Sequence, residues 1–485
     1  MKYIGTFKSG IVFVVLFSMI LLSACRQESS KSTGYSETPN ILFIAIEDFN
    51  PEHLGCYGGK ALTPNIDRLA SEGVLFANAF VDGAVCNPSR TALLTGLRPA
   101  TSGVYGNSDK WQELALPKTG FTLPQHFMNN GYETAKIGKM FHYKMEHDES
   151  WNRILAVDND QGKILSSFHA DVTPLLDELE NDKSKGWFNE NLQWGPVDCE
   201  PEEFRDGSYV ASVREYFLEE HENPFFLGVG FHAPHVKFAA PKQFFDLYDL
   251  EDIILPENPP DDLLDIPVKL DKNPVHDVMD STQWREIKRA QFACISYVDW
   301  CIGKVLDALE ESRLDGNTIV VIWTDHGFGL GEHFQWSKGG NKLFSEINQV
   351  ACIWKVPGLT PKGMVSNSVV ETIDFFPTMF ELCHIEIPSF VQGESFAAAL
   401  KDPSAKIKDA AFTWGSRQRV SVQTERYRFN MNRDLDPAYF ELYDHKYDPG
   451  EFLNLGCNPQ YQETIQTLIS YYHEHTKKYE LFENE

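Results

Sequence analysis

The chain has too few basic residues for a nucleic-acid-binding protein. Lys and Arg number 43 against 70 Asp and Glu, so the formal net charge of the 485 residues is −27. Binding to nucleic acid requires a basic surface that displaces counterions, and a strongly acidic protein repels polyanions at a distance. This excludes nucleic acid as a partner, and an anionic polymer would need local cations at its binding site. The acidity is also what keeps many secreted proteins soluble.

The nine cysteines include no CxxC pair and no zinc-ligand spacing. Cys25 and Cys86 stand in sequence contexts of their own, which leaves seven, an odd number. No disulfide framework follows from these positions. Four cysteines lie in apolar surroundings and are expected in the core: Cys294, Cys301, Cys352 and Cys383.

The N-terminal apolar run is too short for a comfortable bilayer span. It covers residues 11–22, after Lys2 and Lys8, and residues 1–25 therefore have the features of an export signal. The run ends in Leu22-Ser23-Ala24-Cys25, which resembles a bacterial lipobox. This predicts that Cys25 is lipidated and anchors an exported protein in the bacterial envelope. The alternative is an ordinary cleaved signal. Polar residues 26–38 would then be a tether.

The remaining pattern is that of an α/β protein. Continuous apolar runs predict buried parallel strands at 40–46, 132–137, 224–230 and 318–324. Helices are predicted between them at 63–73, 121–130 and 281–311. This alternation predicts a large, mostly parallel sheet with helices on both faces. Weakly periodic residues 145–200 and 250–280 are predicted to be loops over the active face.

The pattern changes near residue 385, which divides residues 39–385 from a C-terminal subdomain of residues 386–485. Short strand-like runs follow at 411–414, 419–424, 427–430 and 440–443, and a helix at 460–478. They predict a smaller antiparallel sheet packed with one helix.

Acidic residues end two of the predicted strands. Glu47 and Asp48 follow the first strand, and Asp325 and His326 follow the strand at 318–324. Ligands of open α/β sheets bind outside the carboxyl ends of the strands, so these residues predict one metal site. Carboxylate oxygens favour Ca²⁺ or Mg²⁺, although a histidine ligand also suits Mn²⁺ or Zn²⁺. The acids alone would equally suit helix caps or turns.

Cys86 begins a predicted helix that has Pro88 in its first turn and ends at Gly96. A helix N-terminus favours an anion, which by itself suggests a reactive thiolate. A thiolate beside a dication indicates a soft metal, and this conflicts with the hard carboxylate ligands. The conflict disappears if Cys86 does not act as a thiol.

The stretch Cys-x-Pro-Ser-Arg from Cys86, followed by Leu93-Leu94-Thr95-Gly96, resembles the signature of type I sulfatases. The resemblance continues to Leu442-Tyr443-Asp444 and covers roughly residues 39–450. It implies an alkaline-phosphatase-like fold with residues 39–385 as the catalytic domain, and hydrolysis of sulfate esters. It also implies that a formylglycine-generating or sulfatase-maturating enzyme oxidises Cys86 to formylglycine (3-oxoalanine).

Within this family the chain looks most like the iduronate-2-sulfatase branch, through motifs at 54–58, 138–142, 231–235 and 325–333. The resemblance implies one Ca²⁺ held by Glu47, Asp48, Cys86, Asp325 and His326. It implies that Arg90 holds the modified residue and that the sulfate is surrounded by Lys139, His142, His232 and Lys338. Glu47 departs from the family's Asp-Asp pair and is the weakest ligand of this set. Cys56, His235 and His333 are interpreted as structural.

Three functions remain open on the sequence. The leading hypothesis is a sulfatase acting on sulfated oligo- or polysaccharides, such as algal ulvan or glycosaminoglycans. The second is a phosphonate or phosphodiester hydrolase of the same superfamily. The third is a non-catalytic glycan-binding lipoprotein, which would follow if Cys86 is never oxidised.

Overall fold

The computed structural model describes residues 38–155, 192–268, 279–340 and 342–479, with Met1, Leu270 and His276. Contacts divide the chain into two units, Met1–Tyr35 and Ser36–Glu485, and the account below concerns the second. The predicted export signal, the lipidation site Cys25 and nearly all of the tether lie outside the described residues. No helix among the described residues is long and apolar enough to cross a membrane.

An eight-stranded sheet forms the centre of this unit, in the order β10-β2-β9-β8-β1-β6-β3-β4. All its pairs are parallel except those of β9, which runs antiparallel to both neighbours. The four strands predicted from apolar runs are β1 (Asn40–Ile46), β3 (Glu133–Gly138), β6 (Phe225–Gly230) and β8 (Thr318–Thr324). They lie side by side, so the predicted large, mostly parallel sheet is confirmed.

The other four strands were not predicted. They are β2 (Val74–Phe80), β4 (Arg153–Ile154), β9 (Cys352–Lys355) and β10 (Met364–Glu371). β4 and β9 are too short to stand out, and edge strand β10 has exposed side chains in its first half. β5 (Trp194–Val197) lies within the region 145–200 that the sequence predicts as a loop, and it pairs with β7 (Phe238–Pro241). Residues 156–191 of that region lie outside the described part.

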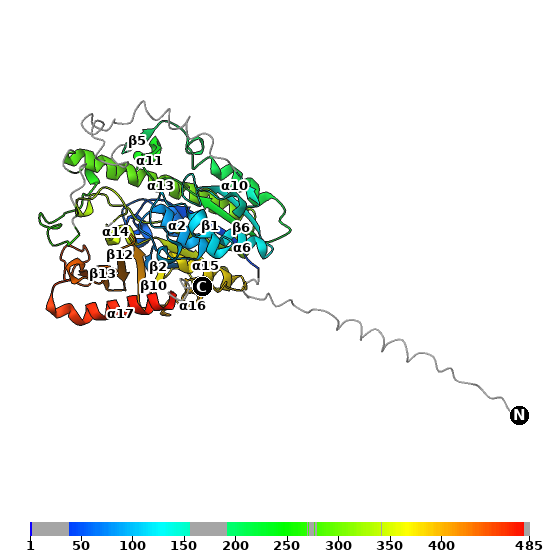
Figure 1. Cartoon of the computed structure of the whole chain (residues 1–485). Helices are drawn as coiled ribbons and strands as arrows, with labels where there is room; N and C mark the ends of the chain where they lie inside the picture. The colour runs from blue at the N-terminus through cyan, green and yellow to red at the C-terminus, as the bar shows by residue number, and fades with distance from the viewer. Residues whose placement is uncertain are drawn as a thin grey trace. The chain divides into compact units, whose positions relative to one another are not determined.

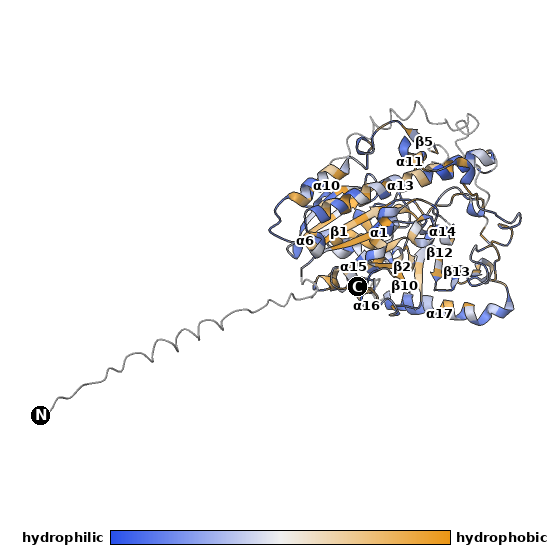
Figure 2. Ribbon diagram, turned by 180° about the vertical axis from the view of Figure 1, so that it is seen from behind, coloured by the Kyte–Doolittle hydropathy of each residue, from blue (hydrophilic) through white to orange (hydrophobic). Residues whose placement is uncertain are grey.

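Helices cover both faces of the central sheet, and β1 and β8 are therefore buried along their whole length. Alternate residues of β1 (Leu42, Ile44, Ile46) belong to one apolar cluster with α13 (Ser281–Glu311). On the opposite face, Phe43 contacts Phe226 and Trp323. Figure 1 shows α13 and α10 (Tyr209–Leu218) above the strands and α6 (Leu123–Asn129) and α15 (Phe375–Leu382) below them. Figure 2 shows that the strands are the most apolar segments.

The C-terminal part contains the predicted antiparallel sheet and helix. The sheet is β11 (Ala411–Trp414), β12 (Arg419–Gln423), β13 (Tyr427–Asn432) and β14 (Glu441–Asp444), in that order. The helix α17 (Gln462–Tyr479) buries Ile465, Leu468 and Tyr472 in one apolar cluster with these strands. The predicted domain boundary at residue 385 stays a prediction, since residues 36–485 form one compact unit.

A buried ion cluster joins this second sheet to the first. Arg98 donates to Asp82 at 2.8 Å and to both oxygens of Glu371, which ends β10. Glu371 in turn accepts the backbone N–H of Phe412 in β11. Gly83, which lies only three residues before Cys86, also forms a β-bridge with Trp414. The C-terminal sheet thereby supports the segment that leads into α2 (Cys86–Thr95).

Candidate active site

Cys86 is the first residue of α2 and is fully buried, as are all ten residues of that helix. Val85 before it is extended, and Gly96 ends the helix in the left-handed region at φ 72°. The predicted helix is therefore confirmed at both ends. Burial raises the pKa of the Cys86 thiol to about 12, and the nearby Asp325 and Asp48 charges also oppose ionisation. This raised pKa disfavours the thiolate, although the charges of Lys338 and Arg90 favour it, so the surroundings of Cys86 are unlike those of an activated thiol nucleophile.

The acidic strand ends meet beside Cys86. β1 and β8 are adjacent, with Ile46 opposite Thr324, so Asp48 and Asp325 emerge at one edge of the sheet. The backbone N–H of Asp48 donates to Asp325 Oδ1 at 3.3 Å. Asp48 itself has a positive φ of 51°, an uncommon conformation for a residue with a side chain. Such strain at a strand end is typical of functional sites.

Asp48, Cys86, Asp325 and His326 form a compact donor set, with ligand atoms all within 4.8 Å of one another. His326 Nε2 lies 3.2 Å from Cys86 Sγ and 3.4 Å from Asp48 Oδ1. The other ring nitrogen, Nδ1, lies 2.9 Å from the Gly327 carbonyl, which fixes the proton there and leaves Nε2 its lone pair. Burial lowers the pKa of His326, so the ring is neutral and able to bind a cation.

Arg90 holds this donor set together from the same helix. Its Nε donates to Asp325 Oδ2 at 2.8 Å, and its Nη2 lies 3.4 Å from Glu47 Oε1. Its Nη1 donates to the carbonyls of Lys139 and Met140 at 2.9 and 3.0 Å. Arg90 lies four residues after Cys86, about one helical turn, so both side chains lie on one helix face. It therefore fixes the loop after β3 against the acids.

The centre contains three buried carboxylates and three cations. Lys338 Nζ donates to both oxygens of Asp48 at 2.5 and 2.6 Å and lies 3.2 Å from Cys86 Sγ. Lys139 pairs with Glu47, and Arg90 pairs with Asp325. Burial lowers the pKa of Lys139 to about 7, whereas Asp48 raises the pKa of Lys338 against the effect of burial. The pKa values of the two ammonium groups are therefore shifted in opposite directions, down for Lys139 and up for Lys338.

A cavity of about 630 Å³ opens beside the centre. It is lined by Val85, Asn107, Lys139, His142, Tyr143, His232, His235, Val236, Ser337 and Lys338. The predicted sulfate-binding residues therefore share one cavity wall. Burial lowers the pKa of His142 and of His235 to about 3, and that of His232 well below its usual value. All three rings are neutral, so the positive charge of this wall comes from the lysines.

The sequence predicts a structural role for His235, but the structure places it on the cavity wall. Its Nε2 lies 3.7 Å from Asp48 Oδ2, and its ring centre lies 5.2 Å from that of His232. The spacing of three residues between the two histidines could have signalled this. His333, by contrast, lies away from the cavity, 3.1 Å from Asp262, and stacks on Phe344. Cys56 is only partly buried, against the main core, and carries no contact with the site.

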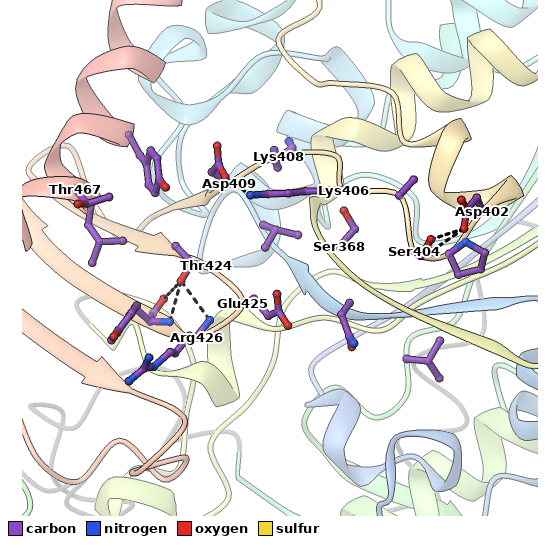
Figure 3. A pocket seen from close by; sticks show the side chains of 18 of the residues that line it. Ser368, Asp402, Ser404, Lys406, Lys408, Asp409, Thr424, Glu425, Arg426 and Thr467 are labelled. Carbon is purple, nitrogen blue, oxygen red and sulfur yellow. Dashed lines mark hydrogen bonds and ion pairs between the residues drawn. The ribbon is translucent and has the colours of Figure 1, made fainter. Parts of the chain in front are cut away.

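A second cavity, of about 750 Å³, is larger but contains none of these residues. Figure 3 shows its wall, between β10, the 402–409 segment and α17. Its cations are already paired, Lys406 with Asp409 and Lys408 with Glu371 and Asp374. The smaller cavity is the candidate active site because it adjoins the buried donor set.

The donor set fits a hard divalent cation. Asp48 and Asp325 supply carboxylate oxygens, and the Lys338 ammonium lies against both Asp48 oxygens, where positive charge balances them. Glu47 Oε2 is buried without a hydrogen bond, so it has a lone pair to offer. Glu47 nevertheless groups with His232 and His235 rather than with the other four predicted ligands. Its extra methylene carries the carboxylate toward Lys139 and His232.

The comparisons identify the family. The sequence profile of sulfatases matches residues 39–385, and that of the N-sulphoglucosamine sulphohydrolase C-terminal region matches residues 331–478. The chain belongs to the sulfatase family, and it is a sulfuric ester hydrolase. Its curated relatives include a sulfatase of Formosa agariphila, 32% identical over 94% of this chain and 90% of the relative.

The iduronate-2-sulfatase branch is a close relative, as the sequence motifs predicted. Iduronate 2-sulfatase of Mus musculus is 35% identical over 77% of this chain and 74% of its own length. An ulvan-active sulfatase of Formosa agariphila is 26% identical over 95% of this chain and 84% of its own length.

Solved structures confirm the predicted fold. A 2-O GAG sulfatase has a TM-score of 0.66 at 24% identity, with 91% of this chain and 94% of that chain covered. A phosphonate monoester hydrolase from Silicibacter pomeroyi has a TM-score of 0.71 at 17% identity, with 91% and 96% covered. The fold is therefore shared by enzymes of two activities.

Glu47→Gln should lower kcat/KM at least about 100-fold, whereas Glu47→Asp should stay within about tenfold of the wild type. The glutamine leaves Lys139 and Arg90 buried with one carboxylate fewer, and an uncompensated buried charge is costly. Aspartate keeps the charge and restores the pair found in the family. Steady-state sulfate release by the purified variants measures this. Equal activity of Glu47→Gln and the wild type would show that the carboxylate has no role.

Proposed function

We propose that this sulfatase hydrolyses sulfate esters of sulfated carbohydrates, with formylglycine made from Cys86 and one bound Ca²⁺. The observation that carries the proposal is the position of Cys86. It is buried with a thiol that resists ionisation, yet it belongs to the donor set and lies 3.2 Å from the Nζ of Lys338, which lines the cavity. Such a residue has little use as a thiol, and oxidation removes the thiol altogether.

Asp48, Asp325, His326, Glu47 and the modified Cys86 would hold the cation. When bound, the dication supplies positive charge against the sulfate and the nucleophile, and hydrated formylglycine supplies two hydroxyls on one carbon. The formylglycine-generating or sulfatase-maturating enzyme that makes this group is a necessary partner.

The chain's own residues bind and orient the ester. Lys139 and Lys338 line the cavity and bind sulfate oxygens as preorganised donors. His232 Nδ1 faces Glu47 Oε2 at 3.5 Å, which leaves Nε2 on the opposite side of the ring. A carboxylate at Nδ1 favours the single proton of the neutral His232 ring on that nitrogen, so we assign the proton that the leaving alcohol oxygen takes up to a nitrogen of the neutral His142. Arg90 donates to Asp325 and to the carbonyl of Lys139, and so holds the loop after β3 and Asp325 against the helix that begins with the modified residue.

Sulfated carbohydrates are favoured as substrates by the relatives. The Formosa agariphila relative is named for activity on ulvan, and the 2-O GAG sulfatase for glycosaminoglycan. The cavity of about 630 Å³ is within the range of pockets that enclose one small ligand. It suits a sugar at a chain end better than the middle of a polyanion, which a chain of net charge −27 would repel.

Export and lipid anchoring belong to the same proposal. The lipobox-like Leu22-Ser23-Ala24-Cys25 and the polar tether would place the catalytic unit in the bacterial envelope, where sulfated polysaccharide fragments arrive. Mass spectrometry of the mature N-terminus tests this: a diacylated Cys25 supports it, and an unmodified N-terminus at another residue contradicts it.

A phosphonate monoesterase is the second candidate because the fold is shared with such an enzyme. We expect one preparation to cleave an aryl sulfate at least about tenfold faster than the matched aryl phosphonate, since the matching sequence profile and the curated relatives at 32% and 35% identity are those of sulfatases. Parallel release assays at equal substrate concentration measure the ratio. A preference for phosphonate would overturn the proposed reaction.

A further inference from the structure

Lys342 has a charge that the described active centre does not use. The lysines of the centre are neutralised by carboxylates, Lys139 by Glu47 and Lys338 by Asp48. Lys342 instead donates its Nζ to the hydroxyl of Ser337. Among the described residues it makes no ion pair, and burial alone lowers its pKa to about 8. A partly buried ammonium without a counter-ion is costly unless something else supplies one.

A backbone turn brings this ammonium to Ser337, which lines the cavity. Gly339 and Gly340 both have positive φ, 78° and 67°, and the N–H of Lys342 lies 3.4 Å from the carbonyl of Gly339. The resulting turn folds Lys342 back onto Ser337. A Cβ at Gly339 would lie 2.1 Å from Val85 Cγ1, so only glycine lets the turn pack against the segment before Cys86.

Ser337 separates Lys342 from the substrate cavity. Ser337, Lys338 and Val85 all line that cavity, and Lys342 is bonded to the Ser337 hydroxyl. A lysine ammonium on its flexible four-carbon stem can reach past a hydroxyl to a second acceptor. Lys338 on the cavity wall is therefore committed to the catalytic acids, whereas Lys342, four residues later and behind Ser337, has an ammonium that no described carboxylate neutralises.

We propose that Lys342, with the Ser337 hydroxyl, binds a second anionic group of the substrate. This inference rests on the proposed function and makes it narrower. The preferred substrate is a sulfated sugar with a further anion, a carboxylate or a second sulfate, on the same or the adjoining ring. The group gains a charge-assisted hydrogen bond from the ammonium, and Lys342 gains the counter-ion that the protein does not supply.

The test compares sugars that share one reactive sulfate. The probes are a 2-O-sulfated uronic acid, a 2,6-di-O-sulfated hexose and a 2-O-sulfated hexose that is otherwise neutral, each assayed with the wild type, Lys342→Gln and Lys342→Arg. Lys342→Gln should lower the ratio of kcat/KM for the preferred doubly anionic sugar over the neutral one at least tenfold, through KM. Lys342→Arg should recover most of that ratio. Which doubly anionic sugar loses more distinguishes a carboxylate from a second sulfate.

The matched control is Lys406→Gln, which removes an exposed lysine paired with Asp409 and should leave every ratio at its wild-type value. Calorimetric titration with the same sugars gives dissociation constants independently of turnover. A wild type that binds the doubly anionic sugar through Lys342 but never releases sulfate would refute the proposed function and support this inference. Equal ratios and equal affinities for the wild type and Lys342→Gln would overturn the inference.

Discussion

Cys86→Ala should abolish sulfate release, with a loss in kcat of at least about 10⁴-fold. Alanine offers no side chain that could be oxidised, and Cys86 is the one cysteine of the buried donor set among the described residues. Cys86→Ser should lose as much if the maturation enzyme does not oxidise serine, because a single hydroxyl cannot do the work of two on one carbon. Sulfate release from an aryl sulfate measures both variants.

The loss must be separated from unfolding, since Cys86 is fully buried. Thermal unfolding of each variant provides this, because replacing one small buried side chain should cost no more than about 1–2 kcal/mol. Cys56→Ala is the matched control, a partly buried cysteine outside the site, and should keep wild-type activity. Mass spectrometry of the wild-type peptide containing Cys86 gives the direct readout. Active protein with only unmodified Cys86 would overturn the mechanism.

The residues that could be predicted from the sequence are those fixed by short local patterns. The apolar runs ending in Glu47-Asp48 and Asp325-His326 correctly gave two adjacent parallel strands, because a buried strand and its acidic end lie within a few residues. The helix from Cys86 to Gly96 followed from Pro88 and the terminal glycine. The long helix α13 was predicted with both its ends, since its apolar face repeats over many turns.

The features that could not be predicted depend on contacts between distant segments. The family resemblance predicted Lys338 as a sulfate-binding residue, but its contact with Asp48 across 290 positions could not be predicted from a local pattern. The antiparallel strand β9 has only four residues, and its pairing with β2 and β8 is decided by the sheet. Glu47 was recognised as a departure from the family pair, but its turn toward Lys139 is a consequence of side-chain length and surrounding charge. No sequence pattern pointed to Lys342, because its proposed role depends on its having no carboxylate partner among the described residues.

Asp325→Asn should lower kcat/KM at least about 10³-fold and remove stabilisation of the protein by calcium. Although burial disfavours its charge, His326, Arg90 and the two lysines hold the pKa of Asp325 well below its usual range. A lowered pKa stabilises the folded state above the unfolded value of about 4 and this contribution is lost as the pH falls through the folded value. Asp325 is thus ionised at every working pH, and asparagine removes a permanent charge.

The two effects of this substitution can be measured separately. Without calcium, Arg90 loses the partner that it holds at 2.8 Å, and breaking a fully buried ion pair lowers the free energy of unfolding by about 3–5 kcal/mol. With calcium at 100 times its dissociation constant, the wild type should gain about 2.7 kcal/mol and Asp325→Asn almost nothing. Chelation of calcium should remove the gain in stability from the wild type, and adding calcium back should restore it.

Asp262→Asn is the matched control for the loss of a buried aspartate. It removes a carboxylate that is paired with His333 at 3.1 Å, outside the catalytic centre. This variant should also be less stable than the wild type, but its unfolding temperature should still rise with calcium. If Asp325→Asn keeps the full calcium response, the cation binds elsewhere and the donor set around Cys86 is not its site.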